Sequence, residues 1–110
     1  MTRSVLPMTA AQRAIYEQLL RTARSIGPFT EDPKKTSIHL TRKSAFAGVT
    51  TRKDALLVTI KAAADIPSRR IVKHQHASAT RWYLDVRLEC PEDVDRELKS
   101  WLAAAMALAS

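Results

Sequence analysis

Apolar and polar residues alternate with a period of two in several short segments, and this constrains the fold more than any other feature. The pattern is clear over residues 37–41, 55–61 and 82–88, and it is shorter over residues 45–50 and 70–74. Such alternation is typical of strands that bury one face. Short polar turns separate residues 37–41, 45–50 and 55–61, so we expect these three strands to form an antiparallel meander.

Helical periodicity appears on either side of these strands. Thr9 is a suitable N-cap and Gln12 stands at the capping-box position of a helix predicted over residues 10–26. A second helix is predicted to open at Cys90-Pro91, with acidic residues in its first turn. Residues 30–34 contain Asp32-Pro33 and are predicted as a loop. The expected fold class is therefore α+β: a helix, a four- to five-stranded antiparallel sheet and a helix, with both helices on one sheet face.

The length of 110 residues is enough for one core and one domain. We expect residues 1–8 to be a flexible segment and residues 9–110 to form a single α+β domain. The single cysteine and the absence of a long apolar N-terminal segment favour the cytoplasm. The longest apolar run, residues 101–109, is far short of the roughly 20 residues that cross a bilayer, so no membrane partner is expected.

Positive charge is concentrated in the middle of the chain. Residues 34–81 carry eleven Lys or Arg against two acids, a net charge of +9, and the rest of the chain sums to −2. This asymmetry predicts an anionic partner, with nucleic acid as first choice and an anionic small molecule as second. Eight of the eleven form adjacent pairs and are the predicted anion-binding residues: Lys34, Lys35, Arg42, Lys43, Arg52, Lys53, Arg69 and Arg70.

Successive turns of a meander lie at opposite ends of the sheet. Lys34-Lys35 and Arg52-Lys53 are accordingly expected at one end, as the primary contact set, and Arg42-Lys43 and Arg69-Arg70 at the other. The segment is then two modest patches rather than one groove.

The sheet face turned away from the helices is predicted to be polar. Its candidate ligand site holds His39, Tyr83, Asp85 and Arg87, with Thr59 and Lys61 beside them. A site around His39, Tyr83 and Asp85 that binds a small molecule or is weakly catalytic is the alternative to a non-catalytic binding module, which is favoured. Tyr83 is the clearest stacking platform for a base.

No metal or other cofactor is expected. His74 and His76 can share one face of a strand, but they lack the second ligand pair that a structural zinc site needs.

The end of the second helix is small or apolar on every side over residues 103–109. A surface of this kind either packs under the N-terminal segment or pairs with a second copy of the chain, so a homodimer through the C-terminal helix is a further hypothesis.

Five short motifs are spread along the chain: Gly-Pro-Phe (27–29), Lys-Thr (35–36), Phe-Ala-Gly (46–48), SRRIVKH (68–74) and DVDRELKSWLAAAMAL (93–108). Together they resemble domain-of-unknown-function family 5655, from about residue 11 onward. The resemblance implies a small α+β domain, names no activity, and carries Lys35 and Thr36 over as site positions.

The chain departs from the family pattern in two places. Tyr83 and Leu84 stand where members usually have one or two histidines, and residues 104–106 replace a Glu-Ala-Tyr. If those family residues build a ligand site, this chain has lost or altered it.

Overall fold

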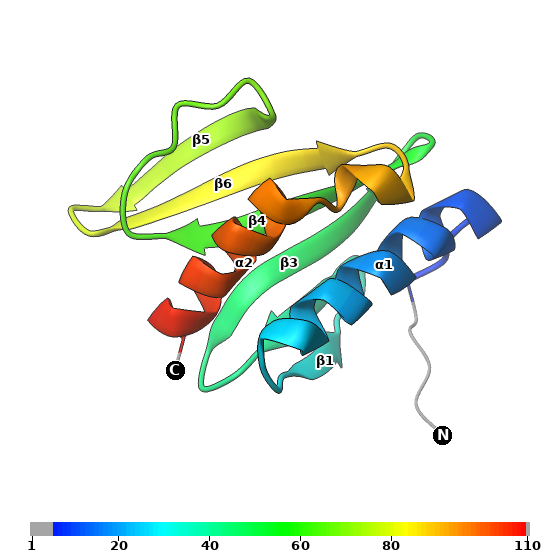
Figure 1. Ribbon diagram of the computed structural model, residues 1–110, viewed down its shortest axis with the longest axis horizontal. Coiled ribbons are helices and arrows are strands. Elements are labelled where there is room, and N and C mark those ends of the chain that lie inside the picture. The colour runs from blue at the N-terminus through cyan, green and yellow to red at the C-terminus, as the bar shows by residue number, and fades with distance from the viewer. Residues whose placement is uncertain (1–5, 110) are drawn as a thin grey trace.

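The computed structural model describes residues 6–109, and within them two α-helices enclose a run of six strands along the chain (Figure 1). The elements are α1 (Ala10–Ile26), β1 (Thr30–Pro33), β2 (Ile38–Thr41), β3 (Ala45–Arg52), β4 (Ala55–Ala62), β5 (Ile71–Ser78), β6 (Arg81–Leu88), the 3-10 turn η1 (Pro91–Asp93) and α2 (Arg96–Leu108). The α+β class and the antiparallel sheet are confirmed.

The N-terminus of α1 has the predicted capping box. The Thr9 hydroxyl accepts a hydrogen bond from the Gln12 backbone N–H, and the Gln12 side chain accepts one from the Thr9 N–H. The amide nitrogen of Gln12 also donates to the carbonyls of Arg52 and Ala55 at 2.6 and 3.2 Å. One side chain therefore caps the helix and ties it to the β3–β4 turn.

The sheet has six strands in the order β1-β2-β3-β4-β6-β5, all antiparallel to their neighbours. The prediction of four to five strands was wrong because residues 30–33 form a strand rather than a loop. Asp32-Pro33 breaks the alternation, yet backbone pairing with β2 still holds β1 at the edge, where proline is tolerated.

The meander ends at β4, because β6 rather than β5 pairs with it. Residues 63–70 cross from the end of β4 back to the opposite end of the sheet, where β5 begins at the outer side of β6. Hence β4 and β5 run in the same direction with β6 between them. The short strand predicted at residues 70–74 extends to Ser78 and forms the second edge.

Both helices contact β4 and each other, and Figure 1 shows them crossing in front of the strands. The side chains between the layers form one core, in which Leu19, Val58 and Leu102 are fully buried. The second helix does not open at Cys90. Pro91 begins a separate 3-10 turn instead, and Asp95 caps α2 by accepting a hydrogen bond from the Leu98 N–H.

A bulge between β2 and β3 aligns Leu40 with Ala47 but Thr41 with Ala45, which leaves Phe46 as the extra residue. Both Phe46 and Ala47 are consequently buried. Gly48 itself lies inside the regular ladder, opposite His39 on β2 and Thr59 on β4.

Of the predicted flexible segment 1–8, residues 1–5 lie outside the described residues. Leu6 is buried in the core and Met8 packs against it. Among residues 6–109, neither helix has the length and hydropathy needed to span a bilayer.

Candidate functional site

The candidate site lies on the sheet face that alternates with the core positions. One register row crosses five strands and brings His39, Gly48, Thr59, Asp85 and Lys73 into line, from β2 to β5. The Thr59 hydroxyl donates to the Asp85 carboxylate at 2.6 Å, which links β4 to β6 on this face. We call this surface the open face.

A hollow of about 260 Å³ lies on the open face. Gly48 forms part of its lining because it has no side chain, and a Cβ built there would meet only the His39 ring edge, at 3.7 Å. Around it stand the small or polar residues Ser37, His39, Ala45, Thr50, Thr59, Lys61 and Tyr83. The hollow therefore combines hydroxyl groups, an imidazole, an ammonium and an aromatic ring.

A basic cluster lies at each end of the strands that carry this hollow. Lys35 lies in the β1–β2 turn, Arg52 ends β3 and Lys53 begins the β3–β4 turn. All three lie at one end of the sheet, and we call them the first cluster. Lys34 is at the same end, but its ammonium is paired with Asp32 at 2.8 Å.

The second cluster consists of Arg42, Lys43 and Lys61. The first two form the β2–β3 turn, and the Lys61 ammonium lies 3.0 Å from the Ser44 hydroxyl of that turn. Strand β3 has eight residues, so the two clusters are separated by roughly 23 Å at ~3.3 Å per residue. The prediction of charge at both ends of the sheet holds for these residues.

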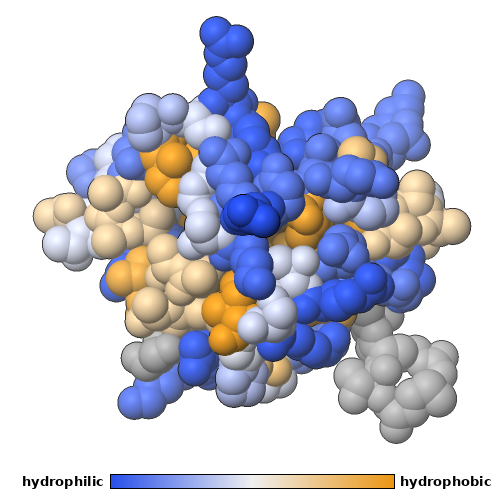
Figure 2. Space-filling view, in the orientation of Figure 1, coloured by the Kyte–Doolittle hydropathy of each residue, from blue (hydrophilic) through white to orange (hydrophobic). Residues whose placement is uncertain are grey.

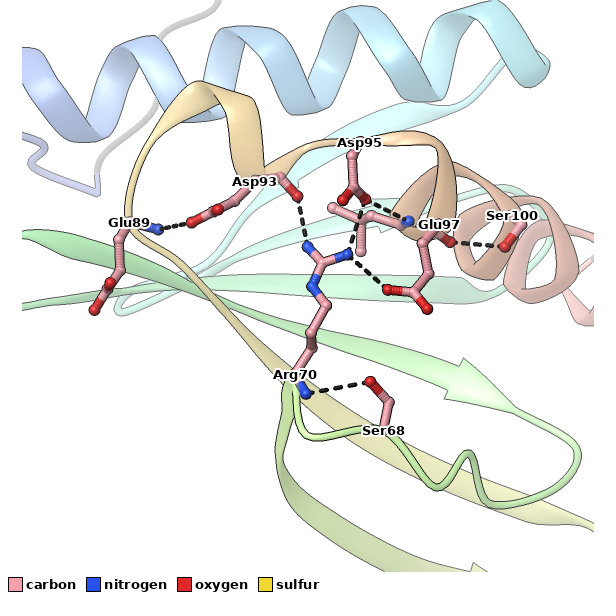
Figure 3. A network of polar contacts seen from close by, with 8 residues as sticks. Ser68, Arg70, Glu89, Asp93, Asp95, Glu97 and Ser100 are labelled. Carbon is pink, nitrogen blue, oxygen red and sulfur yellow. Dashed lines mark hydrogen bonds and ion pairs between the residues drawn. The ribbon is translucent and has the colours of Figure 1, made fainter.

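Arg69-Arg70 was predicted at the wrong end. The crossover of residues 63–70 returns the chain to the end that holds the first cluster, which the assumption of a continuous meander could not anticipate. Arg70 is also occupied there: its guanidinium contacts the Asp95 and Glu97 carboxylates at 2.8 and 3.0 Å and donates to the Asp93 carbonyl at 2.6 Å (Figure 3).

The Arg70 guanidinium also lies 5.5 Å from the centre of the Trp101 ring. Partial burial would raise the pKa of Asp95, but the Leu98 N–H and the Arg70 guanidinium outweigh it and lower that pKa. Arg70 thus fastens the crossover to the start of α2 and is not free to meet a ligand.

The remaining open-face candidates are spread out. His39 and Asp85 lie on strands three positions apart, about 14 Å at ~4.8 Å per strand, so they do not form an acid–base pair. Arg87 is directed to the Glu89 carboxylate at 2.8 Å and to the Lys53 carbonyl at 3.2 Å. Thr36 is exposed in the β1–β2 turn, and its neighbour Ser37 lines the hollow instead.

The two histidines of β5 have separate contacts. The His74 ring bonds to the Asp65 carboxylate of the crossover, whereas the His76 ring stacks on Trp82 with centroids 4.2 Å apart. Within residues 6–109, no three His, Cys, Asp or Glu side chains gather closely enough to hold a metal ion.

A second hollow, of about 240 Å³ and mostly apolar, lies between the crossover and α2. Its lining includes Ile66, Trp101, Ala104 and Leu108. Figure 2 shows pale and orange apolar atoms over this part of the helix-covered face. On the opposite side of the same helix end, Ala105 and Met106 are buried in the core of the chain itself.

Sequence reasoning missed Ser37, Gly48 and Thr50 as lining residues. Ser37 and Thr50 stand two positions from His39 and Gly48 on their strands, so they share the open face by the period of two. That spacing was an available signal. The depth of the hollow at Gly48 depends on which residues of β2 and β4 lie opposite it, and no pattern in the neighbouring sequence predicts that.

Comparison with known proteins identifies the family. The model of domain of unknown function 5655 (DUF5655) matches residues 6–109. No curated protein and no solved structure gives a significant match. Because the family model covers nearly the whole chain, the protein belongs to the DUF5655 family.

Proposed function

We propose that the protein is a non-catalytic binding module whose open face binds single-stranded nucleic acid. The observation that carries the proposal is the position of the hollow on that face, between basic residues at the two ends of the sheet. A strand lying along β3 meets Lys35, Arg52 and Lys53 at one end and Lys43 and Lys61 at the other, whereas the Arg42 guanidinium lies beside Gly27 at the end of α1. Neutralised phosphates release counterions, which supplies sequence-independent affinity.

The hollow suits a base rather than a phosphate backbone. Tyr83 stands at its side, half-buried, with Lys61 opposite it on β4. Stacking of one base on an aromatic ring is worth about 1–3 kcal/mol and tolerates any sequence. Gly48 leaves the space that the base fills, and hydroxyls of Ser37, Thr50 and Thr59 offer polar contacts to its edge.

The separation of the clusters favours a polymer over a small ligand. A molecule confined to a 260 Å³ hollow does not reach across roughly 23 Å. A flat sheet face also admits a single strand with its bases splayed toward the protein, whereas a duplex keeps its bases stacked inside.

Fluorescence anisotropy with a labelled single-stranded oligonucleotide of about twelve nucleotides tests the proposal. We expect affinity that falls as salt rises, and weaker binding of the matching duplex. The double variant Arg52→Gln/Lys53→Gln should reduce the slope of log affinity against log salt by about 1.4. The control Arg96→Gln/Lys99→Gln removes the same charge from exposed positions of α2 and should leave the slope unchanged.

Absence of binding at low salt, or an equal effect of both double variants, contradicts the proposal. Tyr83→Ala separates stacking from charge, because it should weaken binding by about tenfold without altering the salt slope.

An anionic small molecule is the second candidate, favoured by the three hydroxyls and the His39 imidazole around the hollow. A mononucleotide that binds as tightly as the twelve-nucleotide strand would support this candidate against the first.

The homodimer hypothesis for the C-terminal helix also stays a prediction. The apolar hollow beside Trp101 and Leu108 is the surface that a second copy would cover. Sedimentation at tens of micromolar tests it, and a monomer there removes the hypothesis.

A further inference from the structure

Strand β5 presents an open sheet edge. It pairs on one side with β6, and seven of its eight residues are exposed. Within residues 6–109, the only backbone bond from β5 outside that ladder is the one from the Ile71 N–H to the Ser68 carbonyl. The outward N–H and C=O groups beyond Ile71 are thus a template for one more strand.

The two sheet edges differ in their protection. At the other edge, β1 has four residues, ends in Pro33, and has its Glu31 carboxylate held by Tyr16 and Arg24. No proline occurs in β5. Irregular pairing at Ile71/Lys73 and His76/Ser78 leaves a short regular stretch between them, sufficient for a few residues of an added strand.

Charge decides which strand fits this edge. No acidic residue occurs between Ile66 and Leu84, and Lys73, Arg69 and Arg81 form no ion pair among the described residues, although Asp85 stands opposite Lys73 on β6. Asp65 is engaged by His74. A second β5 paired antiparallel would bring like charges together, which destabilises a sheet, whereas an acidic strand is attracted.

An apolar contact is available next to this regular stretch, at the irregularity between Ile71 and Lys73. Val72 is a large hydrophobic residue that is 58% exposed. An added strand would remove part of the Val72 side chain from water.

From the unpaired backbone, the unbalanced positive charge and Val72, we propose that the outer edge of β5 binds an extended acidic segment of a partner protein as an added strand. Backbone hydrogen bonds provide affinity that depends little on sequence, and alternate acidic side chains select for this edge. The proposal does not depend on nucleic-acid binding at the open face.

The probe is a fluorescein-labelled octapeptide of alternating Glu and Val, compared with a Lys–Val counterpart and with a version N-methylated at every residue. The acidic peptide should bind and the basic one should not. N-methylation keeps the charge but removes the backbone donors, and should weaken binding by more than about tenfold. Amide hydrogen exchange at residues 72–78 should slow when the acidic peptide is present.

Variants of the full chain locate the site. Val72→Ser should weaken peptide binding by about fivefold and Lys73→Gln by about threefold, while the control Lys99→Gln has no effect. All three positions are exposed, so the variants are expected to fold.

Three results would overturn the proposal. Equal binding of the acidic and N-methylated peptides would reduce the effect to electrostatics. Oligonucleotide binding weakened by Val72→Ser would assign the edge to nucleic acid. A dimer in which residues 72–78 become protected without peptide would assign it to a second copy.

Discussion

Replacement of Gln12 tests how the fold positions the first basic cluster. The side chain is 5% exposed and makes three hydrogen bonds, one to the Thr9 N–H and two to the carbonyls of Arg52 and Ala55. A typical bond contributes about 1 kcal/mol, and a buried carbonyl left without a donor costs about 1–3 kcal/mol. Gln12→Ala should therefore lower the free energy of unfolding by about 3 kcal/mol, a large part of the stability of a small domain.

Gln12→Glu separates the two roles of this side chain. If the capping box were its main contribution, glutamate would serve equally well, since Glu is a favoured residue at this position. A carboxylate cannot donate to the Arg52 and Ala55 carbonyls and is repelled by them, so we expect a loss of about 3 kcal/mol at neutral pH. Burial beside the Arg52 and Ala55 carbonyls disfavours the charged form and should raise the pKa of the introduced carboxyl group in the folded state. The loss of stability in Gln12→Glu should therefore shrink as pH falls through the acid range.

Urea denaturation followed by tryptophan fluorescence measures both variants, with equal m-values as the check on two-state behaviour. The reasoning is refuted if Gln12→Glu is as stable as the unsubstituted protein at pH 7, because the tether to the β3–β4 turn would then contribute nothing.

Three further outcomes are expected in the same assay. Arg70→Met should lower the free energy of unfolding by about 1–2 kcal/mol at neutral pH. Because the pKa of Asp95 is lowered in the folded state, the stability of the unsubstituted protein should fall as pH drops below about 4, and that of Asp95→Asn should fall less steeply. Tyr16→Phe should cost about 1–2 kcal/mol, because burial, reinforced by the 2.6 Å hydrogen bond to the Glu31 carboxylate, raises the pKa of Tyr16 and keeps the phenol protonated as donor. Gly48→Ala should raise stability by up to about 1 kcal/mol, since its Cβ meets no close contact, and a loss instead would contradict the geometry of the hollow.

The features set by local sequence were predictable. The capping box follows from the separation between Thr9 and Gln12 along the chain. The buried and exposed faces of β2, β4 and β6 follow from the period of two. Membership of the family could also be recognised from short motifs.

What depended on pairing between distant strands was not predictable. Strand β1 lacks a periodic pattern and is held by its ladder with β2. The pairing of β4 with β6 joins segments separated by the crossover and β5, and together with the pairing of β5 with β6 it decides at which end of the sheet Arg70 lies. In that position Arg70 is neutralised by acidic residues 25 and 27 positions away along the chain. Composition alone therefore could not show that its charge is unavailable to a ligand.

The most direct test of the open face is an NMR titration of the protein with the single-stranded oligonucleotide of about twelve nucleotides. The chain has two glycines, so the amide signal of Gly48 in the hollow falls in a sparsely populated region of the spectrum. The account predicts that the amide signals of Gly48, Ser37 and Tyr83 shift on titration, while that of Lys99 on the outer surface of α2 does not. Shifts confined to α1 and α2, with Gly48 unmoved at saturation, would contradict it.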